Sequence, residues 1–563
     1  MTSRRSVRLL AVLLAALVAL AGCVSLPRSG PVSASQPELP PSEGIGLFAA
    51  GPREGASPQE IVEGFLTASA AGYSDEFLVA RQFLAGPAVQ AWQPLEQVRI
   101  YADNPAPSFG RTDDGGVRLT VAAEASVDSA GHYTESPPET TIEAGFTLVR
   151  NAAGEWRIVE LDDGVLLPAA NFRSLYAQGA VYFLTPEQDA LVPDVRWYPR
   201  ENQATALVRG LLDGPSQWLS PGVVTMVPAG TRMTVEAVTV ADGVARVDLS
   251  ADALSADPEE RAALYAQVER TLLGVPGVQL IQITAAGAPY EVTEPIPELS
   301  SYPYTTGSLV VVADGALAEV VAGEVVPLAG GSLAGLDARS PALGYETEQP
   351  TLVLLDGADR LVTAPSAQSQ SFLLAQGSAL VAPSVDIDGW VWTSPQESAG
   401  DVVAVQDSGT RVAVDVPWLA GGRVHALRIS REGARAVVVW ESGGRTLIDV
   451  AAVVRGLDGV PRALAEPVRI GERMTTATDA AWVDEQTVAV LGTSGGDAAP
   501  VVHLLPIGGP TTRLPAVDGA VTITAGRGDR SLVVGTESGR IYERNGASWR
   551  PVLTEAFFPT LPG

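Results

Sequence analysis

One short motif in the chain has the form of a serine-hydrolase nucleophile. Gly492-Thr493-Ser494-Gly495-Gly496 matches the G-x-S-x-G pattern, in which the serine occupies a sharp turn between a strand and a helix. Here a strand precedes the motif, but a loop rich in Gly, Asp and Pro and then a second strand follow it. His503 lies in that second strand, where a surface position is expected, and no acidic partner for it is identifiable. The pattern therefore predicts a turn between strands rather than a catalytic set.

The histidines and the acidic residues give no metal-binding pattern. His132, His425 and His503 are the three histidines of the chain and lie in three separate regions. Asp248 and Asp252 could face a cation, but one strand residue and one loop residue make a weak site. We therefore predict no metal site and no cofactor.

Two further motifs have a structural interpretation. The segment 384–392 resembles the Asp-box turn of sialidase-like propellers, in which a carboxylate, here Asp386, caps a β-turn. Sialidase chemistry would also need an arginine cluster and a Tyr/Glu pair, and no local motif reveals either. Arg527-Gly528-Asp529 is an adhesion-type tripeptide that fits a hairpin turn. With no convergent catalytic set, we predict that the protein is not an enzyme.

Composition excludes several classes of function. The chain has 563 residues, 65 acidic and 37 basic, with a net charge of −28, and every basic residue is arginine. The absence of lysine excludes a P-loop lysine, a Schiff-base lysine and a protein-kinase site. The strong negative charge argues against a nucleic-acid partner, because phosphate binding needs a basic surface.

The single cysteine lies at the end of a secretion signal. Arg4, Arg5 and Arg8 precede an unbroken apolar run at 9–20, which is too short to span a membrane but fits a signal peptide. The run ends in a sequence typical of a lipobox, made of Leu20, Ala21, Gly22 and Cys23. Cys23 is therefore the predicted lipidation site: it receives an S-diacylglycerol group and becomes the mature N-terminus, with N-acylation of that residue left open.

A diacyl anchor holds a protein durably on a membrane, because each buried methylene contributes about 0.8 kcal/mol. We therefore expect the protein at the cell membrane, lipid-anchored on its extracytoplasmic face. Loss of residues 1–22 removes three arginines and takes the net charge from −28 to −31.

Two α+β units are predicted after a Pro-rich linker. In the first, Ser57-Pro58-Gln59-Glu60 has the form of a capping box that opens a helix, a second helical stretch runs from 77 to 84, and period-2 strands follow up to residue 161. This order resembles the NTF2-like fold. In the second, helices are expected at 204–212 and from about 258, with a strand leading to Val240 and a tight turn at Asp242-Gly243. This second unit contains the motifs LLDGPS (211–216), VPAGT (227–231), ARVDLS (245–250) and TLLGVPGV (271–278), and it resembles the GerMN domain.

Beyond residue 306, turn signals recur about every ten residues. Segments 308–328 and 531–552 align as three short strands each. A second signature recurs with steps of 49, 42, 55 and 41 residues, and its equivalent positions are Leu336, Val385, Leu427, Trp482 and Ile523. This is the spacing of propeller blades. We predict a β-propeller of about six blades, with five or seven as the alternatives, whose first blade is completed by the first strand of the last.

The predicted fold is therefore multidomain, with two α+β domains (NTF2-like, then GerMN) followed by an all-β propeller. The predicted boundaries are a signal peptide at 1–22, a lipid-anchored linker at 23–44, the NTF2-like domain at 45–178, the GerMN domain at 179–293, a linker at 294–306, the propeller at 307–556 and a C-terminal tail at 557–563.

This arrangement closely resembles the LpqB lipoprotein family of high-GC Gram-positive bacteria. The resemblance implies a non-enzymatic accessory lipoprotein that binds the extracellular region of a sensor histidine kinase, MtrB of the MtrAB two-component system. It also implies a role in envelope homeostasis and cell division, and it carries over no partner-binding residue. The alternative is an envelope protein that binds or cleaves glycan in the propeller channel.

Overall fold

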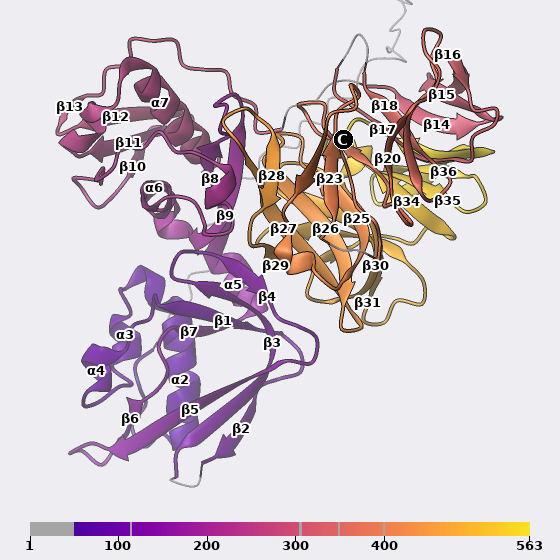
Figure 1. Cartoon of the computed structure of the whole chain (residues 1–563). Coiled ribbons are helices and arrows are strands. Elements are labelled where there is room, and N and C mark those ends of the chain that lie inside the picture. The colour runs from indigo at the N-terminus through magenta and orange to yellow at the C-terminus, as the bar shows by residue number, and fades with distance from the viewer. Residues whose placement is uncertain (1–49, 113–114, 303–306, 347–349, 398–399) are drawn as a thin grey trace, which may run out of the picture. The chain divides into compact units, whose positions relative to one another are not determined.

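The computed structural model describes residues 50–563, apart from 113–114, 303–306, 347–349 and 398–399 (Figure 1). This part of the chain forms two α+β domains and then a six-bladed β-propeller, which confirms the predicted fold class. The predicted signal peptide, the lipobox with Cys23 and the linker up to residue 44 lie outside the described residues. Among the residues that are described, no helix is long and apolar enough to cross a membrane.

The first domain packs one capped helix, α2 (Pro58–Ala71), against a curved sheet. The Ser57 hydroxyl accepts a hydrogen bond from the Glu60 amide, and the Glu60 carboxylate accepts one from the Ser57 amide at 2.8 Å, so the predicted capping box is confirmed. The sheet has the order β6 (Trp156–Glu160), β5 (Thr141–Arg150), β3 (Val117–Asp128), β1 (Gln97–Tyr101) and β7 (Val165–Pro168), with β2 (Ser108–Arg111) and β4 (Tyr133–Glu135) paired to β3.

The second helical stretch of this domain is shorter than predicted. Only α3 (Leu78–Arg81) forms within 77–84, because Glu76 and Phe77 have φ angles of 55° and 61°, which no α-helix accommodates. Phe77 instead turns its ring into the core beside Trp92. Two further short helices are α4 (Ala88–Ala91) and α5 (Ala169–Leu175).

The second domain surrounds a hairpin with two helices and a small sheet. The hairpin joins β8 (Tyr176–Leu184) to β9 (Leu191–Pro199), and the helices are α6 (Gln203–Asp213) and α7 (Pro258–Leu273). The Asp242-Gly243 turn has φ angles of 53° and 77°, as a tight primed turn requires. The sheet has the order β10 (Thr239–Ala241), β11 (Val244–Leu249), β12 (Leu280–Ala285) and β13 (Ala288–Pro289).

The strand predicted to lead to Val240 is largely irregular. Its only regular part is β10. Before it, Met233 forms a single antiparallel bridge with Leu249 at the end of β11, and the pairing is interrupted between that bridge and Thr239. Strand β9 was not predicted, since Pro193, Asp194 and Arg196 give it a polar sequence. Asp194 and Arg196 are buried because they pair with each other.

The propeller closes with a strand from the far C-terminus. Strand β38 (Ala556–Thr560) pairs with β14 (Leu309–Ala313) and completes the first blade with β15 (Ala316–Val321) and β16 (Glu324–Ser332). The predictions that the last blade's first strand completes this blade and that 557–563 is a tail are therefore wrong. Pro559 hid the strand from sequence reasoning, because proline is depleted in strands except at edges and bulges, and it lies at a bulge here.

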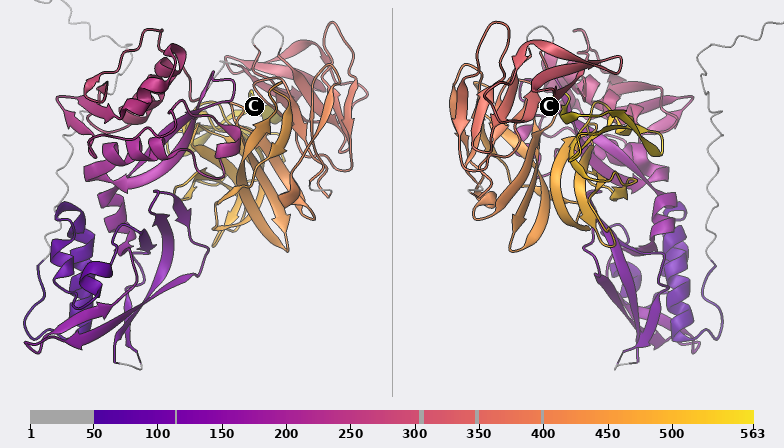
Figure 2. Two further views of the ribbon diagram at one scale, coloured as in Figure 1. Left: turned by 60° about the vertical axis from the view of Figure 1, so that its left-hand side comes forward. Right: turned by 90° about the vertical axis from the view of Figure 1, so that its right-hand side faces the viewer.

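Figure 2 shows the other five blades from two further sides. The second blade contains β17 (Ala338–Leu343), β18 (Leu352–Asp356), β19 (Arg360–Thr363) and β20 (Leu373–Gln376), and the third β21 (Ser384–Val385), β22 (Val391–Thr393), β23 (Val402–Val405) and β24 (Arg411–Val414). The fourth contains β25 (Arg423–Ile429), β26 (Arg435–Ser442), β27 (Arg445–Arg455), β28 (Pro461–Leu464) and β29 (Val468–Ile470). The fifth contains β30 (Met474–Trp482), β31 (Thr487–Ser494), β32 (Val501–Pro506) and β33 (Thr512–Arg513), and the sixth β34 (Ala520–Thr524), β35 (Val533–Thr536), β36 (Ile541–Asn545) and β37 (Ser548–Leu553).

The predicted linker at 294–306 contains a residue that is fixed inside the propeller. Tyr302 is 1% exposed, and its hydroxyl accepts a hydrogen bond from Arg431 Nε at 2.7 Å. The same hydroxyl lies 2.8 Å from the carbonyl oxygen of Gly526 and donates to it. The segment is therefore a connection anchored on the propeller, and not only a spacer.

Candidate functional site

The serine motif forms a turn between two strands of the fifth blade. Ser494 ends β31, and β32 begins at Val501, so the predicted turn between strands is confirmed. The turn brings Ser494 Oγ to 3.1 Å from His503 Nε2. His503 is 1% exposed, so its predicted surface position is wrong. It also has an acidic neighbour that sequence reasoning missed: Asp497 Oδ2 lies 3.2 Å from the same Nε2 atom.

The geometry of this cluster differs from a catalytic triad. In a triad, the serine contacts one ring nitrogen of the histidine and the carboxylate contacts the other. Here Ser494 and Asp497 share Nε2, while His503 Nδ1 faces the carbonyl oxygen of Val501 at 3.2 Å. Ser494 donates its hydroxyl proton to Asp497 at 3.0 Å, and Asp497 also accepts from the Ser494 amide at 2.9 Å. The three residues therefore stabilise the turn.

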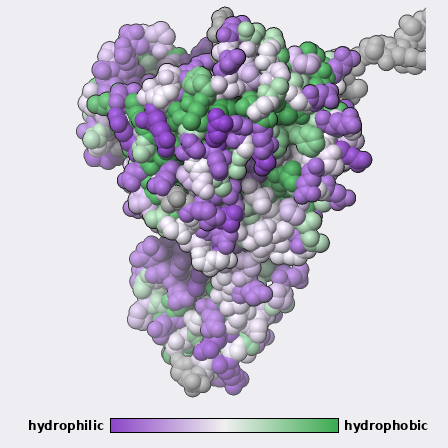
Figure 3. All heavy atoms as spheres, turned by 45° about the vertical axis from the view of Figure 1, so that its right-hand side comes forward, coloured by the Kyte–Doolittle hydropathy of each residue, from purple (hydrophilic) through white to green (hydrophobic). Residues whose placement is uncertain are grey.

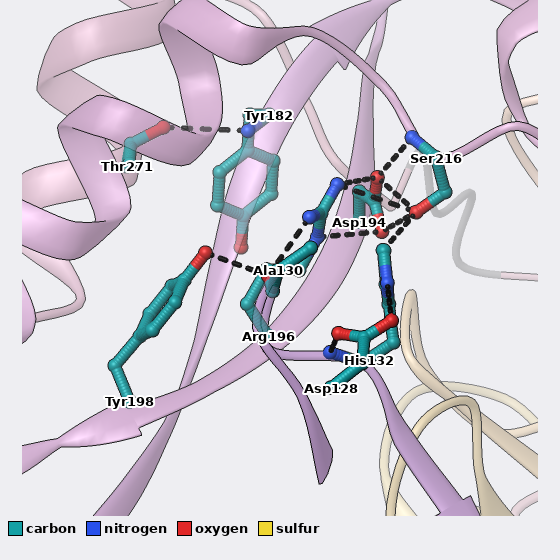
Figure 4. Close-up of polar contacts among 9 residues, drawn as sticks. All are labelled: Asp128, Ala130, His132, Tyr182, Asp194, Arg196, Tyr198, Ser216 and Thr271. Carbon is teal, nitrogen blue, oxygen red and sulfur yellow. Dashed lines mark hydrogen bonds and ion pairs between the residues drawn. The ribbon is translucent and has the colours of Figure 1, made fainter. Parts of the chain in front are cut away.

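A second Ser/His/Asp cluster lies where the first and second domains meet (Figure 4). His132 comes from the turn between β3 and β4, and Ser216 follows α6, where Gly214 with a φ of 95° turns the chain toward β9. His132 Nδ1 lies 2.8 Å from Asp128 Oδ2, and His132 Nε2 lies 2.8 Å from Ser216 Oγ. These contacts follow the order of a triad, although sequence reasoning did not connect these residues.

The protons in this second cluster are arranged for structure and not for nucleophilic attack. Ser216 Oγ lies 2.7 Å from both carboxylate oxygens of Asp194, which can only accept, so the hydroxyl proton points there. His132 Nε2 therefore faces a hydroxyl oxygen whose proton is already directed at Asp194. Without a serine proton directed at the ring, the contact lacks what the general base of a triad needs.

A buried ion pair supports the same joint. Arg196 Nη2 donates to Asp194 Oδ2 at 2.7 Å, and both side chains are at most 5% exposed. Arg196 Nη1 and the Tyr198 hydroxyl also donate to the carbonyl oxygen of Ala130, at 3.0 and 2.8 Å (Figure 4). Ser216, Asp194 and Arg196 are buried and bind His132 and Ala130 of the first domain, so the cluster fastens two domains together.

The remaining candidates from the sequence are dispersed. Asp386 accepts from the Trp390 amide at 2.8 Å, from Trp392 Nε1 at 2.9 Å and from Arg455 Nη2 at 2.7 Å, so its predicted structural role in a turn is confirmed. Asp248 is bound by Thr234, Thr284 and the Gly287 amide, whereas Asp252 accepts from Ser250. The tripeptide at 527–529 lies in the connection between β34 and β35.

The propeller channel holds a cavity of about 320 Å³. Five of the innermost strands, β17, β25, β30, β34 and β38, contribute residues to its lining. An ion pair lies in it: Arg428 Nη2 donates to Asp479 Oδ1 at 2.8 Å. Just after the end of β25, Arg431 packs between the rings of Tyr302 and Tyr345, with its guanidinium carbon 5.0 and 5.4 Å from their centroids. These buried side chains fill the channel beyond the cavity.

Three family models match the chain in the order of its domains. The N-terminal domain of lipoprotein LpqB matches residues 51–173, the sporulation and spore germination domain matches 180–291, and the lipoprotein LpqB beta-propeller domain matches 315–562. The chain belongs to the LpqB lipoprotein family. The predicted resemblance is therefore confirmed. The match to the beta-propeller family model ends at residue 562 and so includes the closing strand β38.

Relatives in this family match over nearly their whole length. Lipoprotein LpqB of Streptomyces avermitilis is 27% identical over 100% of this chain and 99% of its own, and that of Cutibacterium acnes is 27% identical over 98% of both. Lipoprotein LpqB of Thermobifida fusca is 28% identical over 97% of both chains.

Similarity to solved structures is partial. The first GerMN domain of the sporulation protein GerM from Bacillus subtilis is 19% identical, with a TM-score of 0.19, and covers 22% of this chain and 92% of that one. TolB from Acinetobacter baumannii is 12% identical, with a TM-score of 0.31, and covers 70% of this chain and 90% of that one.

Proposed function

We propose that the protein is a non-enzymatic lipoprotein, anchored through Cys23 on the extracytoplasmic face of the cell membrane. It binds the extracellular region of a sensor histidine kinase of the MtrB type and modulates its signalling in envelope homeostasis and cell division. The observation that carries the proposal is the match of the whole chain to lipoproteins of one family. The two Ser/His/Asp clusters support the non-enzymatic part, because each serine directs its proton to an aspartate.

Direct contacts between the domains support a role as one binding platform. Trp197 Nε1 of the second domain donates to the Gly508 carbonyl oxygen of the propeller at 2.7 Å. Glu135 of the first domain accepts from Thr511 Oγ1 of the propeller at 2.9 Å. Burial raises the pKa of Glu135, and the hydrogen bonds from Thr511 oppose that effect. A kinase domain bound to one unit would therefore also sense the position of the others.

The first two blades present apolar side chains that suit a protein partner. Val325 and Val326 lie on the outermost strand β16 and are 36% and 46% exposed, and Phe372 and Leu373 are each 47% exposed. Figure 3 shows green, apolar side chains among the purple ones on the upper part of the face drawn there. Exposed apolar surface on an unpaired edge strand favours association with another protein.

Crosslinking in intact cells tests the kinase partner directly. The kinase should be recovered with the wild-type lipoprotein and lost with a form in which Val325 and Val326 are both replaced by Arg. A matched control replaces the exposed Val240 of the second domain by Arg, and this form should retain the kinase. Recovery of other membrane proteins with no kinase among them would contradict the proposal.

Complementation of a null strain tests whether binding matters for signalling. With kinase-dependent transcription as the readout, an anchored form without the propeller should fail to complement. Full complementation by that form would remove the propeller from the mechanism.

The anchor is tested separately. Cys23→Ser should release the protein from the membrane fraction or leave the signal peptide uncleaved. A processed variant that still requires detergent for extraction would show that the lipobox interpretation is wrong.

A further inference from the structure

The cavity at the open part of the propeller channel is surrounded by β-bulges. In each of five innermost strands, the ladder to the next strand contains a bulge whose extra residue lines the cavity. Strand β30 has a second bulge, at Thr475, which does not line it. The bulge falls between Arg339 and Ala342 in β17, at His425 in β25, at Thr478 in β30, at Val521 in β34 and between Phe557 and Thr560 in β38.

Bulges of this kind redirect side chains and are common beside binding sites. Two of them also hold a non-glycine residue in the left-handed region: φ is 44° for Ser340 and 52° for Phe558, and both residues line the cavity. Such conformations cost about 1–3 kcal/mol each and persist where the surroundings enforce them. Five bulges that converge on one cavity, two of them with a residue in this conformation, indicate a built site.

The bulges also indicate the shape of the ligand. The inner edge of each blade carries backbone groups that could pair with an added peptide strand. A bulge interrupts that straight edge and twists it, which disfavours strand addition. The volume of about 320 Å³ is at the lower end of the range for small-molecule sites, about 300–1,000 Å³. The site is therefore suited to a compact ligand.

The charges in the cavity favour a neutral ligand. Arg428 and Asp479 form an ion pair with side-chain exposures of 15% and 11%, so together they add no net charge. Asp479 also accepts from the amides of Ala480 and Ile523, and Arg428 Nη1 donates to backbone carbonyls, but a carboxylate and a guanidinium each have further hydrogen-bonding capacity for a ligand. Burial lowers the pKa of His425, which keeps the ring neutral at physiological pH. Arg339 lies at the rim and is already paired with Asp337 at 2.8 Å. Adjacent hydroxyl groups of a sugar match such a donor–acceptor pair.

One side of the cavity is apolar. Val521 is 38% exposed and Phe558 is half-buried, and they lie on neighbouring strands, since the Leu561 amide after β38 donates to Thr524 Oγ1 of β34 at 3.3 Å. A pyranose ring has one polar edge and one face of C–H groups, and aromatic and branched side chains pack against that face.

We propose that this cavity, formed by the bulged inner strands, binds a neutral sugar unit of the size of a mono- or disaccharide. Asp479 and Arg428 bind adjacent hydroxyls, His425 adds a further polar contact, and Val521 and Phe558 pack against the C–H face of the ring. This site is independent of the proposed kinase partner.

The test is binding of chitobiose and cellobiose to the intact lipoprotein in a detergent without a sugar headgroup. Saturation-transfer NMR should show that each disaccharide contacts the protein, with transfer to the C–H protons of its ring. Calorimetry should give a saturable isotherm with a dissociation constant in the micromolar to millimolar range. Val521→Arg places a long charged side chain at the lining of the cavity and should abolish binding. His425→Ala should weaken it by about tenfold, which corresponds to about 1.4 kcal/mol.

Val240→Arg is the matched control, because Val240 is a strand valine of the second domain with a similar exposure of 41%. It should leave binding unchanged. Unaltered circular dichroism and thermal unfolding show that each variant is folded. The proposal is overturned if neither disaccharide binds the folded wild type at millimolar concentration, or if Val521→Arg binds as well as Val240→Arg. Saturable binding of an extended peptide in place of the disaccharides would also overturn it.

Discussion

The joint between the first two domains and the turn in the fifth blade use the same three residue types for different purposes. At the joint, Asp128, His132 and Ser216 are in the order of a catalytic triad, but the Ser216 hydroxyl donates its hydrogen bond to Asp194. In the blade, Ser494, Asp497 and His503 lie equally close, but the serine and the carboxylate share one ring nitrogen. The first cluster has the contacts of a triad in the right order, but its serine hydroxyl does not donate to the histidine. The second cluster has the three residue types, but their contacts are not in the order of a triad.

The comparison shows that residue identity and distance do not define a catalytic site. A general base needs a free lone pair directed at the nucleophile, and a nucleophile needs a proton that this base can remove. In both clusters the serine hydroxyl already donates its hydrogen bond to a carboxylate and not to the histidine. The hydrogen bonds of both clusters then stabilise the fold. The more buried a side chain is, the larger its contribution to the free energy of unfolding should be.

The largest effect is expected at the buried ion pair of the joint. Asp194→Ala leaves the Arg196 guanidinium buried without its partner and removes both acceptors of Ser216. Loss of one member of a buried pair costs about 3–5 kcal/mol in the free energy of unfolding. Urea unfolding measures it. Asp162→Ala, which removes an exposed partner of Arg99, is the control and should cost about 0.5 kcal/mol or less. Similar values for both variants would contradict the structural role of the joint.

The next largest effect is expected in the blade. His503 is 1% exposed, so His503→Ala leaves a cavity and removes a hydrogen-bond partner from Ser494 and Asp497. We expect a loss of about 2–3 kcal/mol in thermal unfolding. Burial lowers the pKa of His503, so the ring is neutral at physiological pH and no full charge is lost. Complementation should be retained at temperatures where the variant is folded. Loss of complementation by a folded variant would revive an enzymatic role for this cluster.

Local patterns predicted much of the fold, whereas long-range pairings were missed. The capping box at Ser57 and the turn at Asp242-Gly243 depend on neighbouring residues, and both formed as expected. The closing strand β38 pairs with β14, some 250 residues earlier in the chain, and no local pattern contains that partner. Strand β9 was missed because Asp194 and Arg196 make its sequence polar, although their pairing allows burial.

The same reason explains which site residues were found. Ser494 was noticed through a five-residue motif, but its partner Asp497 was not, because an aspartate in a Gly-rich loop has no distinctive signal. His132 and Ser216 are 84 residues apart and belong to two domains, so their contact depends on how the domains pack. Cys23 was predicted from an adjacent apolar run and four residues, and it stays a prediction.

The response to acid tests the contribution of Asp497 to the blade cluster. In the blade, the Ser494 amide, with the Arg513 side chain, lowers the pKa of Asp497 from 3.8 to about 2. Its stabilisation is therefore present above about pH 3.8 and is lost as the pH falls toward 2. Asp497→Asn should cost about 1.5 kcal/mol at neutral pH, and the difference from wild type should shrink below pH 3.8 in urea unfolding. A difference that does not depend on pH would contradict this assignment.

At the joint, the corresponding substitution of the histidine should have a smaller effect than in the blade. The His132 side chain is 34% exposed and Asp128 is 56% exposed, so water replaces the lost hydrogen bond to Asp128. Ser216 keeps its bonds to Asp194. His132→Ala should therefore cost about 1 kcal/mol, less than half the effect of His503→Ala, in the same thermal unfolding experiment. Equal losses for His132→Ala and His503→Ala would show that burial does not determine how much each histidine stabilises the fold.

The smallest effect is expected for Ser494→Ala. The Ser494 amide continues to donate to Asp497 at 2.9 Å after the hydroxyl is removed, and Arg513 remains 2.6 Å from the other carboxylate oxygen. The hydroxyl bond to Asp497 at 3.0 Å and the contact with His503 Nε2 at 3.1 Å are lost, but His503 Nε2 remains 3.2 Å from Asp497. The free energy of unfolding should therefore fall by less than about 1 kcal/mol. A catalytic serine would behave differently, because its removal costs several orders of magnitude in turnover with little change in stability. Kinase-dependent transcription in a complemented null strain should therefore be unchanged, with Thr493→Ala as a control on the same turn. Loss of complementation by the folded Ser494→Ala protein, but not by Thr493→Ala, would show that the blade turn acts chemically after all.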